Sequence, residues 1–323
     1  MAVIKEPNGK SPFTLLPQGS HRRRFVRKLF VDPRPPGHLE RNFLPVEGVP
    51  ENLELDQEEI GDTFGGRVWI ARRFVVPWLD RARRLKDCRL LEIGCGVGAS
   101  TVAFAEQFSH VTAVDVDADA VAIARERCGK LGHNVDFVIT NATDVPRLLK
   151  GQKFDFIVFY ASIEHMTHQE RLDAIRGTWE MLEPGAFWCI TGTPNRLWCF
   201  DFHTAYLPFY FWLPDDLAFA YAKFSNRTGF RELYDQPTPE NIHHFLRRGR
   251  GVSYHEFDLA IRPVSTLDIV SSMGPQLRDQ RLLNKWRWQF TSDFAFESLL
   301  RRAAPGIHPG FFQRFLNILI RKD

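Results

Sequence analysis

Glycines at every second position follow a short apolar run near residue 90. Residues 89–93 are mostly apolar, Glu92 stands near their end, and Gly94, Gly96 and Gly98 follow. The apolar spacing of the next ten residues is that of a helix. At a turn between a strand and a helix, glycines let the backbone fold sharply and approach a ligand without side chains in the way. The pattern predicts a cofactor site at this turn.

Two kinds of cofactor fit this turn. As a Gly-x-Gly-x-x-Ala pattern that begins at Gly94, it satisfies the permissive dinucleotide fingerprint of nicotinamide-dependent oxidoreductases. As Glu92-x-Gly94-x-Gly96-x-Gly98, it resembles motif I of class I S-adenosylmethionine-dependent methyltransferases. The resemblance implies that Glu92 holds the amino group of the methionine moiety, and that Gly94, Cys95, Gly96 and Gly98 line the cofactor.

Further marks of the same family follow at the ends of the next two predicted strands. Asp115 matches the acid that accepts hydrogen bonds from both ribose hydroxyls, with Val116 beside it at the cofactor. This acid also occurs in NAD enzymes. Asn141 and Ala142 stand where the family usually has an Asp-Ala pair at the adenine. The amide of Asn141 can still pair with the adenine edge.

Beyond the fourth predicted strand, Glu164 and His165 look like the Glu-His pair of ubiquinone-biosynthesis O-methyltransferases and cyclopropane synthases. Ligands of open α/β sheets lie at the carboxyl ends of the strands, so this pair faces the reaction zone. Residues 182–185, Leu-Glu-Pro-Gly, are similar to the family's Leu-Lys-Pro-Gly-Gly turn. That turn has no counterpart in the dinucleotide fingerprint, so it favours the methyltransferase interpretation. Together these marks resemble the ubiquinone-biosynthesis O-methyltransferase, or type 11–12, group of class I S-adenosylmethionine-dependent methyltransferases.

The elements that must position these residues alternate along the chain. Apolar runs and capping residues predict strands at 89–93, 110–115, 135–140, 153–160 and 186–191, with helices at 117–131 and 169–182 between them. This alternation indicates an α/β, doubly wound, mostly parallel sheet, and the resemblance implies the seven-stranded, Rossmann-like methyltransferase fold. Residues 315–320 are expected to form its closing antiparallel strand, or alternatively an amphipathic membrane-surface helix. We expect helices at 67–85 and 239–247 and a strand at 252–261.

The domain organisation is predicted from composition. Residues 1–50 hold eight of the 20 prolines and a basic run at 21–30, so they form an arm. Residues 51–323 form the methyltransferase domain, with acceptor-side insertions at 193–238 and 262–310. Aromatic side chains crowd residues 195–214, where Asn195 and Tyr206 are predicted to contact the acceptor. Asp201 and His203 add polar groups to this segment.

The expected chemistry is methylation of an oxygen on a small glycan, lipid-linked or aromatic acceptor. A hydroxyl needs a base within hydrogen-bond reach, and His165 or His203 is the candidate. We expect the enzyme to work without a metal. A metal held by His243 and His244 with Glu240 or His255 is the alternative, although adjacent histidines point to different faces. Glu164, Asn195 and Tyr206 complete the predicted acceptor side.

Net charge, cysteine content and the length of apolar runs bear on the binding partners and the localisation of the protein. The 323 residues carry a formal charge of +3, so charge alone indicates neither nucleic acid nor an anionic membrane. Five cysteines without a C-x-x-C pair, no secretory leader and no run of about 20 apolar residues predict a cytoplasmic protein, with peripheral contact at the inner face of the membrane as an alternative. Other open alternatives are RNA methylation, a nicotinamide-dependent oxidoreductase, and a non-catalytic partner protein that binds S-adenosylmethionine.

Overall fold

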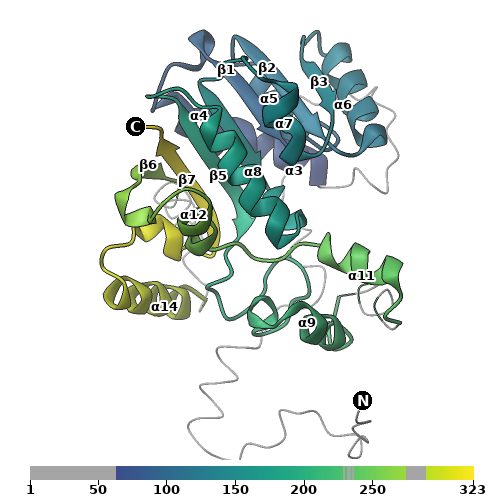
Figure 1. The fold of residues 1–323 in the computed structure, drawn as a ribbon, viewed down its shortest axis with the longest axis vertical. Helices are drawn as coiled ribbons and strands as arrows, with labels where there is room; N and C mark the ends of the chain where they lie inside the picture. The colour runs from purple at the N-terminus through teal and green to yellow at the C-terminus, as the bar shows by residue number, and fades with distance from the viewer. Residues whose placement is uncertain (1–62, 228–229, 231–233, 235, 274–288) are drawn as a thin grey trace, which may run out of the picture. The chain divides into compact units, whose positions relative to one another are not determined.

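A computed structural model describes residues 63–227, 230, 234, 236–273 and 289–323 (Figure 1). The chain divides into two compact units, Met1–His38 and Leu39–Asp323, and every described residue belongs to the second. The proline-rich arm predicted at 1–50 therefore lies outside the described residues. None of the helices within the described ranges is long and apolar enough to cross a bilayer.

A seven-stranded sheet forms the centre of the second unit, in the order β3-β2-β1-β4-β5-β7-β6. The five strands β1 to β5 are parallel to one another, and β7 is antiparallel to both of its neighbours. The prediction of a doubly wound, mostly parallel seven-stranded sheet is confirmed. The strands are β1 Arg89–Ile93, β2 His110–Asp115, β3 Asp136–Ile139, β4 Phe156–Tyr160, β5 Phe187–Pro194, β6 Asp268–Ser272 and β7 Phe315–Arg321.

Strand β7 decides between the two predictions for residues 315–320, and strand β6 was not predicted. β7 pairs with β5, so residues 315–320 form the closing antiparallel strand and not a membrane-surface helix. The buried amide oxygen of Asn317 accepts hydrogen bonds from the Thr191 hydroxyl and the Gly192 N–H, which ties the two strands together. β6 lies inside the segment 262–310 that was expected to be only an insertion. Its five residues, DIVSS, carry too short an apolar pattern to stand out in the sequence.

Helices cover both faces of the sheet (Figure 1). Side chains of β1 alternate between two cores: Leu90 packs with Trp78 and Phe104 on one face, and Leu91 packs with Ile175 and other residues on the opposite face. The first face is covered by α3 Thr63–Ile70, its continuation through the π-helical turn Ala71–Val75 into α4 Val76–Asp80, α5 Ala99–Ala105 and α6 Ala118–Lys130. The second face is covered by α7 Val145–Leu148, α8 His168–Glu180 and α12 Tyr254–Ala260.

Helix α12 corrects one prediction. Residues 252–261 were expected to form a strand, but residues 254–260 are helical. A capping box starts this helix, because the side chains of Ser253 and Glu256 each bond to the backbone of the other. The Ser-x-x-Glu spacing is a recognised start signal for a helix, and it outweighs the local β propensity of the flanking residues.

The segment between β5 and α12 builds a small core of its own beyond the carboxyl ends of β4 and β5. It contains α9 Asp215–Ala222 and α11 Pro239–Leu246, the latter as predicted from the sequence. Tyr210, Phe211 and Phe245 are buried together in this core. Most aromatic residues of the segment therefore stabilise it, while Phe209 and Trp212 remain exposed. The last helix, α14 Gln289–Ala303, precedes β7.

Candidate active site

The glycine-rich turn leaves space for a ligand where β1 ends. Gly94 has φ +81°, and a Cβ atom there would lie 2.3 Å from Cβ of Ser162, so this turn lies too close to the loop after β4 for any side chain. Gly96 has φ +50°, but no protein atom lies within 4 Å of the place a Cβ would take. Backbone at Gly96 thus borders open space. Cys95 between them is buried, and burial strongly raises the pKa of its thiol, so it is not a nucleophile at neutral pH.

Glu92 lies beneath this turn and not beside the open space. It is 0% exposed, and the hydroxyls of Ser100 and Thr101 on α5 donate hydrogen bonds to its two carboxylate oxygens. Burial raises the pKa of Glu92 from its usual value near 4.5 to about 7, against the opposing effect of the two hydroxyls. Neither oxygen reaches solvent. The structure therefore offers no exposed carboxylate at Glu92 for the predicted contact with an ammonium group.

We expect Glu92→Gln to change the pH dependence of stability. The folded protein holds the Glu92 proton more tightly than the unfolded chain, so this contribution is fully present below pH 4.5 and is lost as the pH rises through about 7. The glutamine variant lacks this contribution. Between pH 5 and pH 8 the wild type should therefore lose roughly 2–3 kcal/mol of unfolding free energy relative to the variant. Urea unfolding of both proteins at the two pH values measures this difference. If the free energies of unfolding of the two proteins differ by the same amount at pH 5 and at pH 8, Glu92 is ionised over this whole pH range.

Asp115 and Val116 lie across the turn, at the end of β2. One carboxylate oxygen of Asp115 accepts the Gly96 N–H at 2.7 Å and the other accepts the Asp117 N–H at 3.0 Å. These bonds aim the carboxylate along the rim of the open space, and they leave further lone pairs for a diol. Val116 is 68% exposed although it is apolar. An exposed apolar surface beside an oriented acid is what the ribose and adenine of a nucleoside require.

Asn141 lies at the end of β3, and its side chain is engaged by the protein. Its oxygen accepts the Thr143 N–H, and its amide donates to Glu170 at 3.3 Å. Glu170 in turn forms an ion pair with Arg247 at 2.7 Å. The adjacent Ala142 is buried in the core. One proton of the amide group is left for a ligand. The pairing with adenine remains a prediction, and it would use this proton.

Glu164, His165 and His203 converge at the carboxyl ends of β4 and β5. Nε2 of His165 lies 4.0 Å from Oε1 of Glu164, and Nε2 of His203 lies 3.9 Å from the same atom. Glu164 is completely buried, while the side chains of His165 and His203 are 44% and 25% exposed. Thr193 donates a hydrogen bond to Oε2 of Glu164 at 3.0 Å. Oε1 has no hydrogen-bond partner among the described residues.

Hydrogen bonds on the far side of each ring determine which nitrogen carries the proton. Nδ1 of His165 lies 2.9 Å from the carbonyl oxygen of Arg247, which only accepts, so Nδ1 is the donor. The single hydroxyl proton of Thr204 goes to the carbonyl of Gly249, so the hydroxyl must accept the Nδ1–H of His203. Burial lowers the pKa of His203, which favours the neutral ring. In the neutral rings both Nε2 atoms then carry lone pairs that face Glu164.

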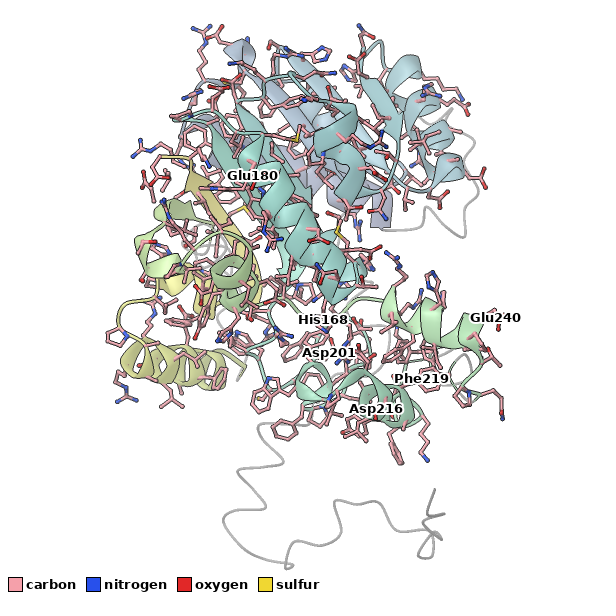
Figure 2. The ribbon with its side chains drawn as sticks, in the orientation of Figure 1. His168, Glu180, Asp201, Asp216, Phe219 and Glu240 are labelled. Carbon is pink, nitrogen blue, oxygen red and sulfur yellow. The ribbon has the colours of Figure 1, made fainter. Side chains whose placement is uncertain are left out.

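The predicted acceptor-side residues of the insertion take different places. Asn195 is buried, and its amide group donates to the carbonyls of Phe311 and Gln313 and accepts from the Leu197 N–H, so it ties the loop after β5 to the segment just before β7. Tyr206 is half-buried beneath the guanidinium of Arg227. Asp201 is buried and accepts three backbone N–H groups of the loop 203–205. Figure 2 shows Asp201 between the end of α8 marked by His168 and helix α9.

Arg171 holds the loops of this site together, and it was not predicted. It lies on α8, is completely buried, and donates hydrogen bonds to the carbonyls of Glu164, Met166, Arg250 and Gly251. The loop that carries Glu164 and His165 is thereby joined to residues 247–251, which hold both rings. One signal was present in the sequence: Arg171 shares a helix face with the buried Ala174, Ile175 and Thr178.

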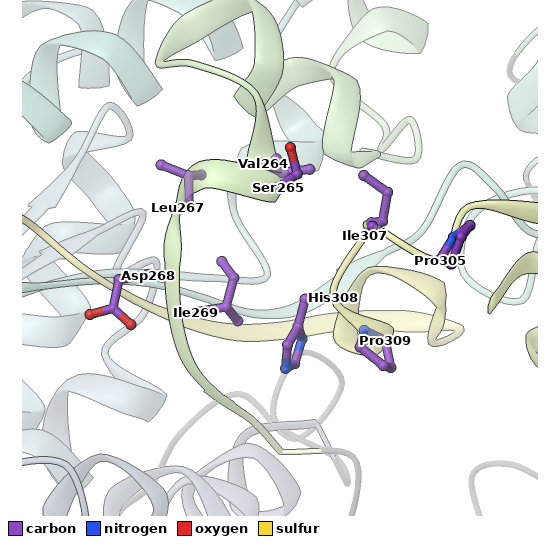
Figure 3. A pocket seen from close by; sticks show the side chains of 10 residues that line it. Val264, Ser265, Leu267, Asp268, Ile269, Pro305, Ile307, His308 and Pro309 are labelled. Atoms are coloured by element: carbon purple, nitrogen blue, oxygen red, sulfur yellow. The ribbon is translucent and has the colours of Figure 1, made fainter.

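Other candidate sites carry less chemistry. A cavity of about 420 Å³ lies at the β6 edge of the sheet (Figure 3), lined by Val264, Ser265, Leu267, Asp268, Ile269 and residues 305–309. None of its lining residues was predicted to act. The alternative metal set of His243, His244, Glu240 and His255 is not assembled: in the described part of the chain, the donor atoms that lie within 4.8 Å of one another belong to Glu164, His165 and His203.

Comparison with known proteins assigns the part of the chain that carries the glycine-rich turn. A family model of a methyltransferase domain matches residues 90–185. A ubiquinone biosynthesis O-methyltransferase of Aromatoleum aromaticum is 31% identical over 91 residues, which are 28% of this chain and 38% of that protein. Residues 90–185 are thus similar to the methyltransferase domain of these enzymes. The corresponding enzyme of Pseudomonas aeruginosa is 29% identical over 110 residues, 34% of this chain and 46% of that protein.

The similarity to the methyltransferases covers the cofactor half of the domain. The chain spans less than half the length of these two curated relatives, 38% and 46%. A solved amino pentose methyltransferase of Micromonospora echinaspora with S-adenosylmethionine bound is 26% identical, with a TM-score of 0.36, over 44% of this chain and 58% of that one. The family's cofactor is S-adenosylmethionine, and the open backbone at Gly96, the oriented Asp115 and the exposed Val116 fit its nucleoside.

Proposed function

We propose that this protein transfers a methyl group from S-adenosylmethionine to an oxygen of a small acceptor. The observation that carries the proposal is the placement of two groups at one edge of the sheet. The nucleoside-type site follows β1 and β2, and the cluster of Glu164, His165 and His203 follows β4 and β5. The matched relatives are named as O-methyltransferases, which favours oxygen over nitrogen or carbon as the methylated atom.

The residues of the turn would hold the cofactor. Gly96 lets the backbone lie against it, Asp115 would accept the ribose hydroxyls, and Val116 would cover the adenine ring. Glu92 supports the turn from below through Ser100 and Thr101. When bound, S-adenosylmethionine supplies a methyl group that its cationic sulfur already activates, so the protein needs to align the acceptor, exclude water and remove a proton.

The cluster would receive the acceptor. A hydroxyl at Nε2 of His165 or His203 meets an unprotonated nitrogen and can pass its proton to it. The buried Glu164 carboxylate stabilises the imidazolium that forms, because opposite charges attract strongly where water is excluded. The exposed aromatic rings of Phe209 and Trp212 on the same insertion favour an aromatic, glycan or lipid-linked acceptor, in line with the sequence prediction.

We expect Asp115→Ala to weaken S-adenosylmethionine binding by roughly 10- to 100-fold, since hydrogen bonds to a charged group contribute about 1.5–3 kcal/mol. Asp119→Ala is the matched control, because Asp119 is an exposed carboxylate on the next turn. Isothermal titration of the wild type and both variants with S-adenosylmethionine and with NAD⁺ measures the effect. Equal affinities in the two variants would remove Asp115 from the site, and tight NAD⁺ binding would support the oxidoreductase alternative.

The acceptor is best sought directly. Extract fractions, lipid and aqueous, are incubated with the protein and a labelled methyl donor, and the product is identified by mass spectrometry. Label in a small hydroxyl compound of either fraction supports the proposal. Binding of S-adenosylmethionine with no methyl transfer to any fraction would support instead the non-catalytic partner protein.

A further inference from the structure

We infer that Glu164, His165 and His203 bind one divalent transition-metal cation, with Zn²⁺ as a suitable occupant. The sequence predicted a metal-independent enzyme. In the fold, one carboxylate oxygen and two imidazole nitrogens come within 4.8 Å of one another. Their chemistry and their hydrogen bonds both favour a cation between them.

The three atoms that converge are all acceptors. Both Nδ1 atoms donate away from the cluster, to the carbonyl of Arg247 and to the hydroxyl of Thr204. In the neutral rings the lone pairs therefore belong to the Nε2 atoms, which lie 4.0 Å and 3.9 Å from Oε1 of Glu164. That oxygen is buried and has no hydrogen-bond partner among the described residues. A buried carboxylate oxygen without a partner is costly. A cation placed among the three lone pairs would satisfy all of them together.

The surroundings are those of a metal site. A histidine that binds a metal usually donates its other N–H to a carbonyl or a similar acceptor, which fixes its tautomer and orientation. His165 does so directly through Arg247, and His203 does so through Thr204, whose own proton goes to Gly249. The second oxygen of Glu164 is likewise held, by the Thr193 hydroxyl. Each of the three ligands is thus oriented by a separate hydrogen bond.

The three ligand atoms must move closer together to bind a cation. Donors of a tetrahedral site with bonds of about 2.0–2.1 Å lie roughly 3.3 Å apart. The two nitrogens lie 4.0 Å and 3.9 Å from the carboxylate oxygen, so each must come roughly 0.6–0.7 Å closer to it for this geometry. The 44% exposure of His165 leaves it room to turn. The same exposure leaves a side of the cluster open for a further ligand, as in catalytic zinc sites with three protein ligands.

A ligand set of two imidazoles and one carboxylate favours some divalent cations over others. Nitrogen ligands suit Zn²⁺, Fe²⁺, Co²⁺ or Ni²⁺, whereas Mg²⁺ and Ca²⁺ prefer oxygen ligands. For its chemical role the inference rests on the proposed function: an acceptor oxygen at the open side would bind the cation, which lowers the pKa of the hydroxyl. The cation would then replace the histidines as the group that activates the oxygen.

The test measures metal binding without any methyl donor. Protein stripped by a chelator is titrated with Zn²⁺ in competition with a chromophoric chelator, and Mg²⁺ serves as comparison. We expect one Zn²⁺ per chain, with affinity at least about 100-fold weaker in Glu164→Gln and in His203→Ala. His243→Ala is the matched control, because His243 is exposed and lies outside the cluster, and it should bind as the wild type does.

Two further readouts keep the result interpretable. Far-ultraviolet circular dichroism and thermal unfolding of each variant show whether it is folded, and Glu164→Gln keeps the shape of the side chain and an acceptor for Thr193. The visible absorption of Co²⁺ bound to the wild type reports nitrogen and oxygen ligands at low coordination number. Absence of stoichiometric Zn²⁺ binding, or equal affinity in folded Glu164→Gln, His203→Ala and wild type, would overturn the inference. Zinc binding without methyl transfer would contradict the proposed function and leave the metal site standing.

Discussion

Replacing Arg171 by methionine is expected to lower the free energy of unfolding by about 3–5 kcal/mol, the range measured when one partner of a buried ion pair is removed. Arg171 is completely buried, and it donates hydrogen bonds to four backbone carbonyls from two separate segments. It also lies 3.8 Å from the buried carboxylate of Glu256. Methionine fills a similar volume but donates no hydrogen bond, so the carbonyls lose donors and the carboxylate loses a countercharge.

Urea unfolding at neutral pH measures this loss. Arg176→Met is the matched control on the same helix: Arg176 is exposed and its contact with Asp173 is a long one at 3.4 Å, so a change within about 0.5 kcal/mol is expected. Arg171→Lys should fall between the two, because one ammonium group cannot reach four carbonyls in two directions. If Arg171→Met costs less than about 1 kcal/mol, the two segments are held by other contacts.

The second large effect is expected on methyl transfer. His203→Ala should lower turnover by about 10²- to 10⁴-fold, the usual contribution of a positioned proton-transfer group. Affinity for S-adenosylmethionine should stay within about twofold, because His203 lies at the β4 and β5 end of the sheet edge and the nucleoside-type site lies at β1 and β2. A residue that acted only through stability would change both quantities.

The experiment uses the acceptor found in the extract fractions and initial rates with labelled methyl donor. His255→Ala is the control, since the His255 ring lies on α12 beside Ser253 and outside the cluster. Turnover of His203→Ala equal to that of the control would remove His203 from the reaction. A base role and a metal-ligand role both predict the loss, and only added Zn²⁺ separates them: it would raise turnover of the metal-stripped wild type if the cation activates the oxygen.

Much of the fold could be predicted from local patterns. The strands at 89–93 and 110–115 and the helices at 169–182 and 239–247 were placed within two residues of their observed ends. Each is specified by its own apolar periodicity and by residues that cap it, so no distant contact is needed to recognise it. The differences are also local in cause. The apolar residues around α12 predict a strand although a capping box starts a helix there, and β6 is too short to show a pattern.

The residues of the candidate site also fall into those that local spacing predicts and those that packing decides. The glycine turn and Asp115 lie within 24 residues of one another, from Glu92 to Asp115, and their roles depend on spacing that any reader of the chain can see. Glu92 shows the limit, because its spacing predicts a cofactor contact while the structure buries its carboxylate against the hydroxyls of Ser100 and Thr101. Whether a side chain faces solvent is decided by packing, which spacing alone does not reveal.

By itself the sequence determined the alternation of strands β1 to β5 with helices α6 and α8, the glycine turn around Gly96 and the acid at Asp115, because these follow from short-range periodicity and backbone sterics. Only the tertiary structure decided that Glu164 and His165 would meet His203, 38 residues further on, and that Arg171 would fasten the loops around them. These segments are far apart in the chain, and hydrogen bonds donated to the carbonyls of Arg247 and Gly249 hold them together. Such long-range hydrogen bonds orient lone pairs and protons, and no pattern within one segment encodes that orientation.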